Sequence, residues 1–188
     1  MSHFLSERLL LCLLKFLFFP YNKLRNKYYA FAFSTHGLIV GKNISIVGSK
    51  NIKIGRQVIL GNQTWLDAIG TGSISIGSDV SLSQNVHIAA AKAVIIENGC
   101  LIGSDVLISD HDHSFGDNSA MILPKNRPLS VRDITKLGEN CWLGDNVKIL
   151  SGVTLGNNVV VAANSVVTRS FPDNVVIGGI PAKILKNI

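Results

Sequence analysis

The residues best suited to chemistry lie in one short stretch, SDHDHSFGD, from Ser109 to Asp117. It holds two histidines and three aspartates in nine residues. Histidine is the side chain that most readily exchanges a proton near neutral pH, so it suits a general base that activates a hydroxyl group. The aspartates could orient an imidazole, although carboxylates in polar loops are more often solvated or cap turns. The stretch therefore indicates a general-base site.

The stretch interrupts a repeat of six residues. From residue 137 the chain reads LGENCW, LGDNVK, ILSGVT, LGNNVV, VAANSV, and earlier blocks include IGRQVI, LGNQTW, IGSDVS and LSQNVH. This period matches neither an α-helix nor simple strand alternation. Six residues make one short strand and a turn, which bury their apolar side chains only by stacking in coils. The repeat predicts an all-β parallel β-helix, with Gly and Asn at corners that disfavour a bulky β-carbon.

The interruption divides the predicted domain. Residues 38–188 should form the β-helix, and residues 109–136 should project from it as a loop, since a uniform coil cannot absorb an insertion of this length. The loop begins at the end of a strand, which would hold its first residues rigidly.

The first 37 residues form a separate apolar and basic segment, predicted to be an amphipathic helix. Its apolar run, Leu9 to Phe19, contains Lys15 and is too short to span a bilayer. Basic residues mostly follow this run, the reverse of a signal peptide. Residues 1–27 carry five Lys and Arg against Glu7 alone. They could lie on an anionic membrane surface, pack on their own domain, or contact another subunit.

Composition narrows the class of protein. The chain has 188 residues, 47% of them hydrophobic, and a net charge of +6. The charge is biased towards the N-terminus rather than spread over a reading surface, which argues against nucleic-acid binding. Cys12, Cys100 and Cys141 are odd in number and far apart, as expected of reduced thiols. We therefore expect a cytoplasmic protein, either free or peripheral on the inner face of the membrane.

Residues 38–188 resemble the hexapeptide-repeat acyltransferases, most closely over NCWLGDNVKILSGVTLGNNVVVAANSVVTRSFPDNVVIGGIPAKILK. The segments VHIAA and ISDHDH are similar to those of bacterial O-antigen, capsule and colanic-acid O-acetyltransferases. The resemblance implies left-handed coils, a homotrimer and acetyl-CoA as the acyl donor, with no metal requirement. It also implies transfer of acetyl to a sugar hydroxyl of a surface polysaccharide or its precursor.

The same resemblance implies roles for particular residues. His111 is the expected general base, with His113 as the second choice and Asn85 in the acceptor site. Other expected acceptor contacts are His87, Asp110, Asp112 and Trp142. The expected coenzyme contacts, including a C-terminal tail, are Trp142, Asp145, Ala163, Thr168, Arg169, Lys183 and Lys186. Alternative readings make Asn85 a turn residue, His87 a packed or surface imidazole, and Trp142 a packing residue at a corner.

Two other functions fit parts of the pattern. A zinc hydratase resembling the γ-type carbonic anhydrases would use three histidines, here His87, His111 and His113, although their spacing departs from that family. A non-catalytic β-helix scaffold would bind a partner and would need neither His111 nor a coenzyme tail.

Overall fold

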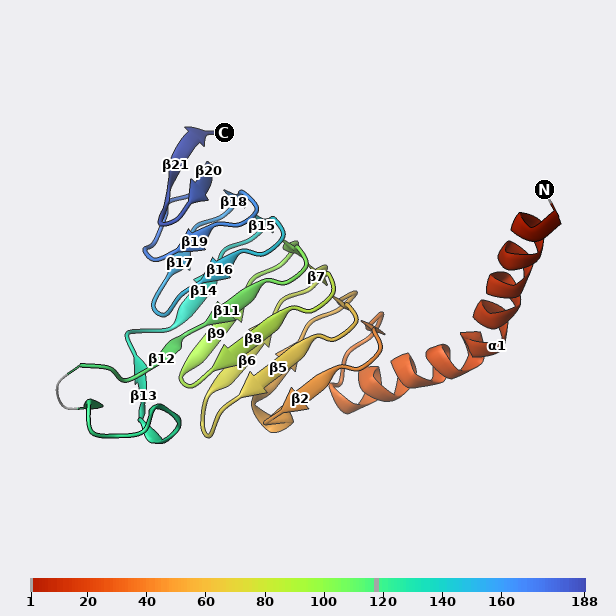
Figure 1. The fold of residues 1–188 in the computed structure, drawn as a ribbon, viewed down its shortest axis with the longest axis horizontal. Coiled ribbons are helices and arrows are strands. Elements are labelled where there is room, and N and C mark those ends of the chain that lie inside the picture. The colour runs from red at the N-terminus through yellow and green to blue at the C-terminus, as the bar shows by residue number, and fades with distance from the viewer. Residues whose placement is uncertain (1, 117–118) are drawn as a thin grey trace.

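The computed structural model describes residues 2–116 and 119–188, and most of them form a parallel β-helix of about seven turns (Figure 1). Asp117, one of the three aspartates noted above, lies outside the described residues. The strands form three faces. Face A contains β1 (Ile39–Val40), β4 (Ile59–Leu60), β7 (Ser81–Leu82), β10 (Leu101–Ile102), β15 (Trp142–Leu143), β18 (Val160–Val161), β20 (Val175–Gly179) and β21 (Ala182–Asn187).

Faces B and C complete the triangle. Face B contains β2 (Ser45–Val47), β5 (Trp65–Ala68), β8 (His87–Ala90), β11 (Leu107–Ser109), β16 (Lys148–Ile149) and β19 (Val166–Val167). Face C contains β3 (Ile52–Ile54), β6 (Ser73–Ile76), β9 (Ala93–Ile96), β14 (Thr135–Leu137) and β17 (Thr154–Leu155). Neighbouring strands within these faces are parallel, except that β21 returns antiparallel to β20. The predicted β-helix is therefore confirmed.

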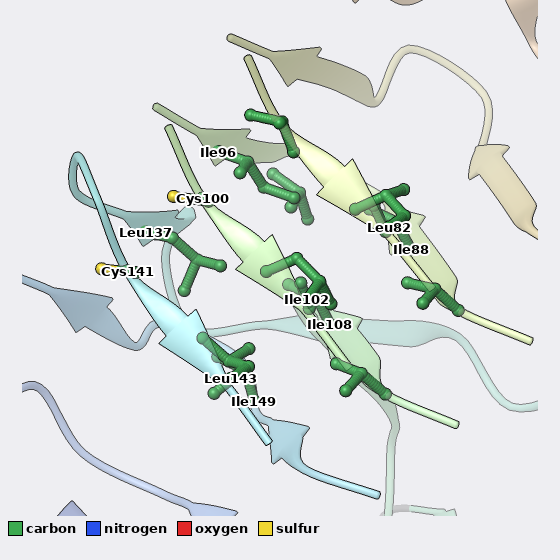
Figure 2. Packing of buried hydrophobic residues seen from close by; sticks show 14 of the residues in the cluster. Leu82, Ile88, Ile96, Cys100, Ile102, Ile108, Leu137, Cys141, Leu143 and Ile149 are labelled. Atoms are coloured by element: carbon green, nitrogen blue, oxygen red, sulfur yellow. The ribbon is translucent and has the colours of Figure 1, made fainter. Parts of the chain in front are cut away.

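The core consists of columns of inward-facing side chains. In each column, one residue from every strand of a face stacks on its counterpart in the next coil. Figure 2 shows part of it, where Ile102, Ile108, Leu143 and Ile149 pack together inside the coils. Cys100 and Cys141 are each 1% exposed and occupy inward positions, as the repeat predicted. Each inward side chain is buried by the coils above and below it, so a single coil would have no core of its own.

Corners contain Asn, Asp and Gln in the left-handed conformation, among them Asn85, Asp105, Asn146 and Asn164. Glycine was expected at corners because of their backbone conformation, but most glycines of the repeat are explained by close contact between neighbouring coils. Gly144 does not have a positive φ, but a β-carbon there would lie 2.7 Å from the backbone nitrogen of Ala163 in the next coil. Glycine is therefore required by the close approach of neighbouring coils, whereas the corner conformation is taken by Asn and Asp.

Two segments depart from the coil. The insertion contains regular structure and is not only a loop. Its strand β12 (His111–His113) pairs antiparallel with β13 (Leu129–Val131), and a short 3₁₀ helix, η3, covers Pro124–Asn126. At the N-terminus, α1 (Ser2–Ala32) runs into the first coil, and Figure 1 shows it bent along its length. Pro20 lies inside α1, where it removes a backbone hydrogen bond. Another short 3₁₀ helix, η1, covers Ser49–Asn51.

The stacking of inward residues predicts that substitutions at the two adjacent positions of β17 lower the free energy of unfolding by very different amounts. Leu155 is fully buried, whereas Thr154 is exposed. We expect Leu155→Ala to lower the free energy of unfolding by about 2–5 kcal/mol, because it leaves a cavity between coils. Thr154→Ala, the matched control, should change it by less than about 0.5 kcal/mol. Urea denaturation measures both, and equal losses would contradict the inward column.

Candidate active site

The candidate site forms where the coil is interrupted at the corner between faces B and C. In the third coil the chain turns this corner through Ala91 and Lys92. In the regular parts of the stack, backbone N–H groups donate to carbonyls of the next coil, as Gly41 does to Leu60. The fourth coil has no corner here, since the chain leaves after Ser109 and rejoins face C at Thr135. The N–H groups below it therefore need other acceptors.

The Asp110 carboxylate supplies those acceptors. Its Oδ1 accepts from the Ala91 N–H at 2.8 Å, and its Oδ2 accepts from the N–H groups of Lys92 at 2.8 Å and Ala93 at 2.6 Å. Asp110 is fully buried. A buried carboxylate needs this full set of donors to offset its desolvation. Asp110, which was predicted to contact the acceptor, is 0% exposed in this structure.

The same carboxylate orients His111. The Nδ1 of His111 lies 2.9 Å from Oδ1 of Asp110, and the imidazole side chain is 12% exposed. A proton on Nδ1 satisfies the carboxylate and leaves the lone pair of Nε2 free. Ser109 fixes the backbone here, because its hydroxyl donates to the His111 carbonyl at 2.9 Å and accepts from the His111 N–H at 3.2 Å. The arrangement holds an imidazole that can accept a proton at Nε2.

Two hydroxyl groups close the interrupted corner, one from Thr135 where the fourth coil resumes and one from Ser151 in the fifth coil. The Thr135 hydroxyl donates to the Ser109 carbonyl at 3.0 Å, and the Ser151 hydroxyl donates to the Asp110 carbonyl. Thr135 and Ser151 are both buried. These two residues, like Ser109, were missed in the sequence. In the sequence they could have been recognised only as a Ser or Thr that flanks the insertion or lies in the next coil.

The other two residues of the DHDH motif are more open. His113 is exposed and lies on the same side of β12 as His111, two residues away. Asp112 is also exposed but points to the opposite side of the strand, so it is not placed to orient His111. The structure thus gives His111 a carboxylate partner and leaves His113 at the surface.

His87 lies on face B as the first residue of β8, paired with Leu107 of β11. Its ring stacks on Trp65 with centroids 4.0 Å apart and an interplanar angle of 6°. Its Nε2 is buried without a hydrogen-bond partner. Burial holds the pKa of His87 below its ordinary value, and nearby His111 adds to this, whereas the Asp67 carboxylate opposes it. Trp65 and Asp67 were not identified from the sequence, because only the stacking of coils brings them beside His87.

Asn85 occupies a corner in the left-handed conformation, and its amide donates to the Asp105 carboxylate at 2.6 Å. This is the turn role that the sequence left open as the alternative. Among residues 2–116 and 119–188, no group of three His, Cys, Asp or Glu side chains is arranged to hold a metal ion. The histidines proposed for a zinc hydratase, His87, His111 and His113, are therefore not gathered into such a set.

A groove of about 410 Å³ lies at a different corner, between faces A and B. Three of the expected coenzyme residues, Trp142, Asp145 and Ala163, line it together. Trp142 is 53% exposed at its wall, and the small side chains of Ala162 and Ala163 keep it open. The Asp145 carboxylate also accepts from the Ser104 N–H at 2.7 Å. The groove can therefore receive an extended chain along the coil edge.

The remaining coenzyme candidates lie outside this lining, towards the C-terminal end. Thr168 and Arg169 follow β19, and Lys183 and Lys186 lie on β21 (Figure 1). All four are exposed, and the Arg169 guanidinium lies 5.3 Å from the centroid of the Phe171 ring. Arg169, Lys183 and Lys186 thus place positive charge near the C-terminal end of the β-helix, outside the groove wall.

A β-helix of hexapeptide coils with an oriented histidine at an interrupted corner defines a class of acyl-transfer enzyme, and the comparisons name the family. Residues 134–169 match the model of the bacterial transferase hexapeptide (six repeats). The chain is 41% identical over 140 residues to the putative lipopolysaccharide biosynthesis O-acetyl transferase WbbJ of Escherichia coli K12, covering 72% of this chain and 71% of that protein. It belongs to the hexapeptide-repeat acyltransferases, and it is an enzyme.

Two further comparisons agree. The chain is 30% identical to the galactoside O-acetyltransferase of Escherichia coli K12 over 174 residues, covering 90% of this chain and 80% of that protein. A crystal structure of AntD, an N-acyltransferase from Bacillus cereus in complex with dTDP and coenzyme A, superposes with a TM-score of 0.75 at 20% identity, covering 86% and 88% of the chains. That likeness concerns the fold. Membership in an acyltransferase family also excludes the alternative function of a non-catalytic scaffold.

The surroundings of His87 predict opposite responses to two substitutions. Asp67→Asn removes the negative charge that raises the pKa of His87, so that pKa should fall further. Trp65→Ala admits water to the ring, so the pKa should rise towards its ordinary value. Nuclear magnetic resonance of the ring protons against pH measures both, with Asp79→Asn as a control at a distant corner. Shifts in the same direction would contradict this account.

Proposed function

We propose that this enzyme is an acetyl-CoA-dependent O-acetyltransferase that acts on a sugar hydroxyl of a bacterial surface polysaccharide or its precursor. The observation that carries the proposal is His111, held by the buried Asp110 carboxylate with its Nε2 free. The names of the relatives support the acceptor class, since they include lipopolysaccharide, colanic-acid and galactoside O-acetyltransferases. Neighbouring structures with acetyl-CoA or coenzyme A support the donor.

The chemistry follows from the tautomer of His111. Nε2 takes the proton of the acceptor hydroxyl as its oxygen attacks the thioester carbonyl. The tetrahedral intermediate collapses, the carbon–sulfur bond breaks, and the imidazolium returns the proton to the leaving thiolate of coenzyme A. Asp110 stabilises the imidazolium formed between the two proton transfers. No covalent acyl-enzyme is needed. Backbone N–H groups are the better candidates for the oxyanion, because the Asn85 amide already donates to Asp105.

A homotrimer would complete the site. The groove and His111 lie at opposite ends of one strand of face B, since the corner at Gly103 precedes β11 and His111 follows it. The residues from Val106 to Asp110 span about 13 Å in extended form. A thioester bound in the groove of one subunit would therefore be presented to His111 of a neighbouring subunit more directly than to its own. We place the enzyme in the cytoplasm, which suits the free thiols of Cys100 and Cys141.

Replacement of the proposed base tests the mechanism. His111→Ala should lower kcat for acetyl transfer by about 10²–10⁴-fold, the usual contribution of a general base. His113→Ala is the matched control and should retain most of the activity. The assay measures release of coenzyme A thiol with chemically deacetylated bacterial polysaccharide as acceptor. If His113→Ala loses activity and His111→Ala retains it, His113 is the base instead.

The proposed coenzyme contacts predict a selective effect on affinity. Arg169→Ala combined with Lys183→Ala should raise the KM for acetyl-CoA at least tenfold, because two cations that would approach its phosphates are lost. The KM for the glycan should change little. Lys125→Ala, on the insertion, provides a lysine control away from this end. A rise confined to the glycan KM would refute the assignment.

A further inference from the structure

The C-terminal part of α1 is fixed to the β-helix by hydrogen bonds and apolar packing. The Arg25 guanidinium donates to the Val40 carbonyl at 2.5 Å, and the Val40 N–H donates to Oδ1 of Asn26 at 3.1 Å. Tyr29, Ala30 and Phe33 pack against the core. This part covers the open end of the first coil. Figure 1 shows the N-terminal part of α1 extending away from the coils. Phe18, farther along α1, still meets the first coil, where the Lys42 ammonium lies 5.9 Å from the centroid of its ring.

That extended part is strongly apolar at its surface. Six large side chains are each more than half exposed: Leu9, Leu13, Phe16, Leu17, Phe18 and Phe19. Burying such side chains away from water is favourable. Six large apolar side chains exposed within the eleven residues from Leu9 to Phe19 are apolar surface of the kind that marks an interaction site. No helix among the described residues has both the length and the hydropathy to cross a membrane.

Charge at the same end is almost entirely positive. Residues 1–66 contain nine Lys and Arg and one acidic residue, Glu7, whereas residues 67–188 contain nine Lys and Arg and eleven Asp and Glu. Residues 1–66 comprise α1, the first coil and the start of the second, which adjoin in Figure 1. The exposed cations of this end include Lys23 and Lys27 on α1 and Lys42 and Lys50 in the first coil. The end is both apolar and cationic.

We propose that α1 and the first coil bind the surface of an anionic lipid bilayer. The apolar side chains from Leu9 to Phe19 enter the interface, with α1 lying in its plane, and the lysines of α1 and of the first coil face the headgroups. Each Lys or Arg near an anionic leaflet adds to the attraction. A second copy of this chain would cover the apolar surface too, but it would bring two cationic ends together. An anionic bilayer offsets the charge and covers the apolar surface at once.

Vesicle co-sedimentation of the full chain tests the proposal. The protein should bind vesicles of phosphatidylglycerol and phosphatidylcholine at least tenfold more tightly than vesicles of phosphatidylcholine alone, and salt should weaken the binding. Leu13→Ser, Phe16→Ser and Leu17→Ser together should lower binding at least tenfold. The matched control is Phe115→Ser, Met121→Ser and Leu123→Ser, which replaces three exposed apolar residues of the insertion.

A second pair of variants separates the role of charge. Lys23→Glu with Lys27→Glu should abolish the preference for phosphatidylglycerol, whereas Lys125→Glu should preserve it. Failure of the full chain to bind anionic vesicles would overturn the proposal. So would α1 variants that keep vesicle binding but change the oligomeric state in light scattering, since a second copy would then be the occupant. The measurement needs no acetyl transfer, so its outcome is independent of the proposed activity.

Discussion

In-register stacking of coils is the constraint on which the rest of this structure depends. One hexapeptide side is too short to bury anything, so each inward Leu, Ile or Val is covered only by its counterparts one coil away. The stacking also sets the backbone spacing, and Gly144 shows how little room that spacing leaves beside Ala163. A side chain larger than hydrogen at such a position would push two coils apart. The groove and the histidine site are both built on edges that this spacing holds fixed.

The interrupted corner shows how the stack tolerates a break. Removing one corner leaves backbone donors of the coil below without acceptors, and a buried carboxylate replaces the missing carbonyls. Because Asp110 is held from below, it in turn holds the His111 ring in one orientation. Asp110 thus both satisfies the backbone donors at the interrupted corner and orients His111. A substitution of Asp110 would therefore disturb the corner and the imidazole together.

The period of six was enough to predict the β-helix, the position of the insertion and the inward cysteines, because these depend on spacing along the chain. The burial of Asp110, the stack of His87 on Trp65 and the role of Gly144 were not predicted. Each depends on contact with a residue about twenty positions away in another coil, and the period does not say which side chains meet there. The β12–β13 hairpin was missed for a different reason, since its short strands carry no repeat. Trp142, Asp145 and Ala163 were grouped by resemblance, and the structure places them in one groove.

The order of strands on face B fixes the distance between the first coil and His111. From β2 through β5 and β8 to β11, three coil spacings separate the first coil from the strand that leads to His111, which amounts to about 14 Å. If the first coil rests against a bilayer, as proposed, that distance would determine how far from the bilayer a hydroxyl group must lie to reach His111. Sugars close to a lipid anchor would come level with the imidazole, and those farther along a long chain would pass above it. Adding or deleting a coil below β11 would reset which sugar is within reach.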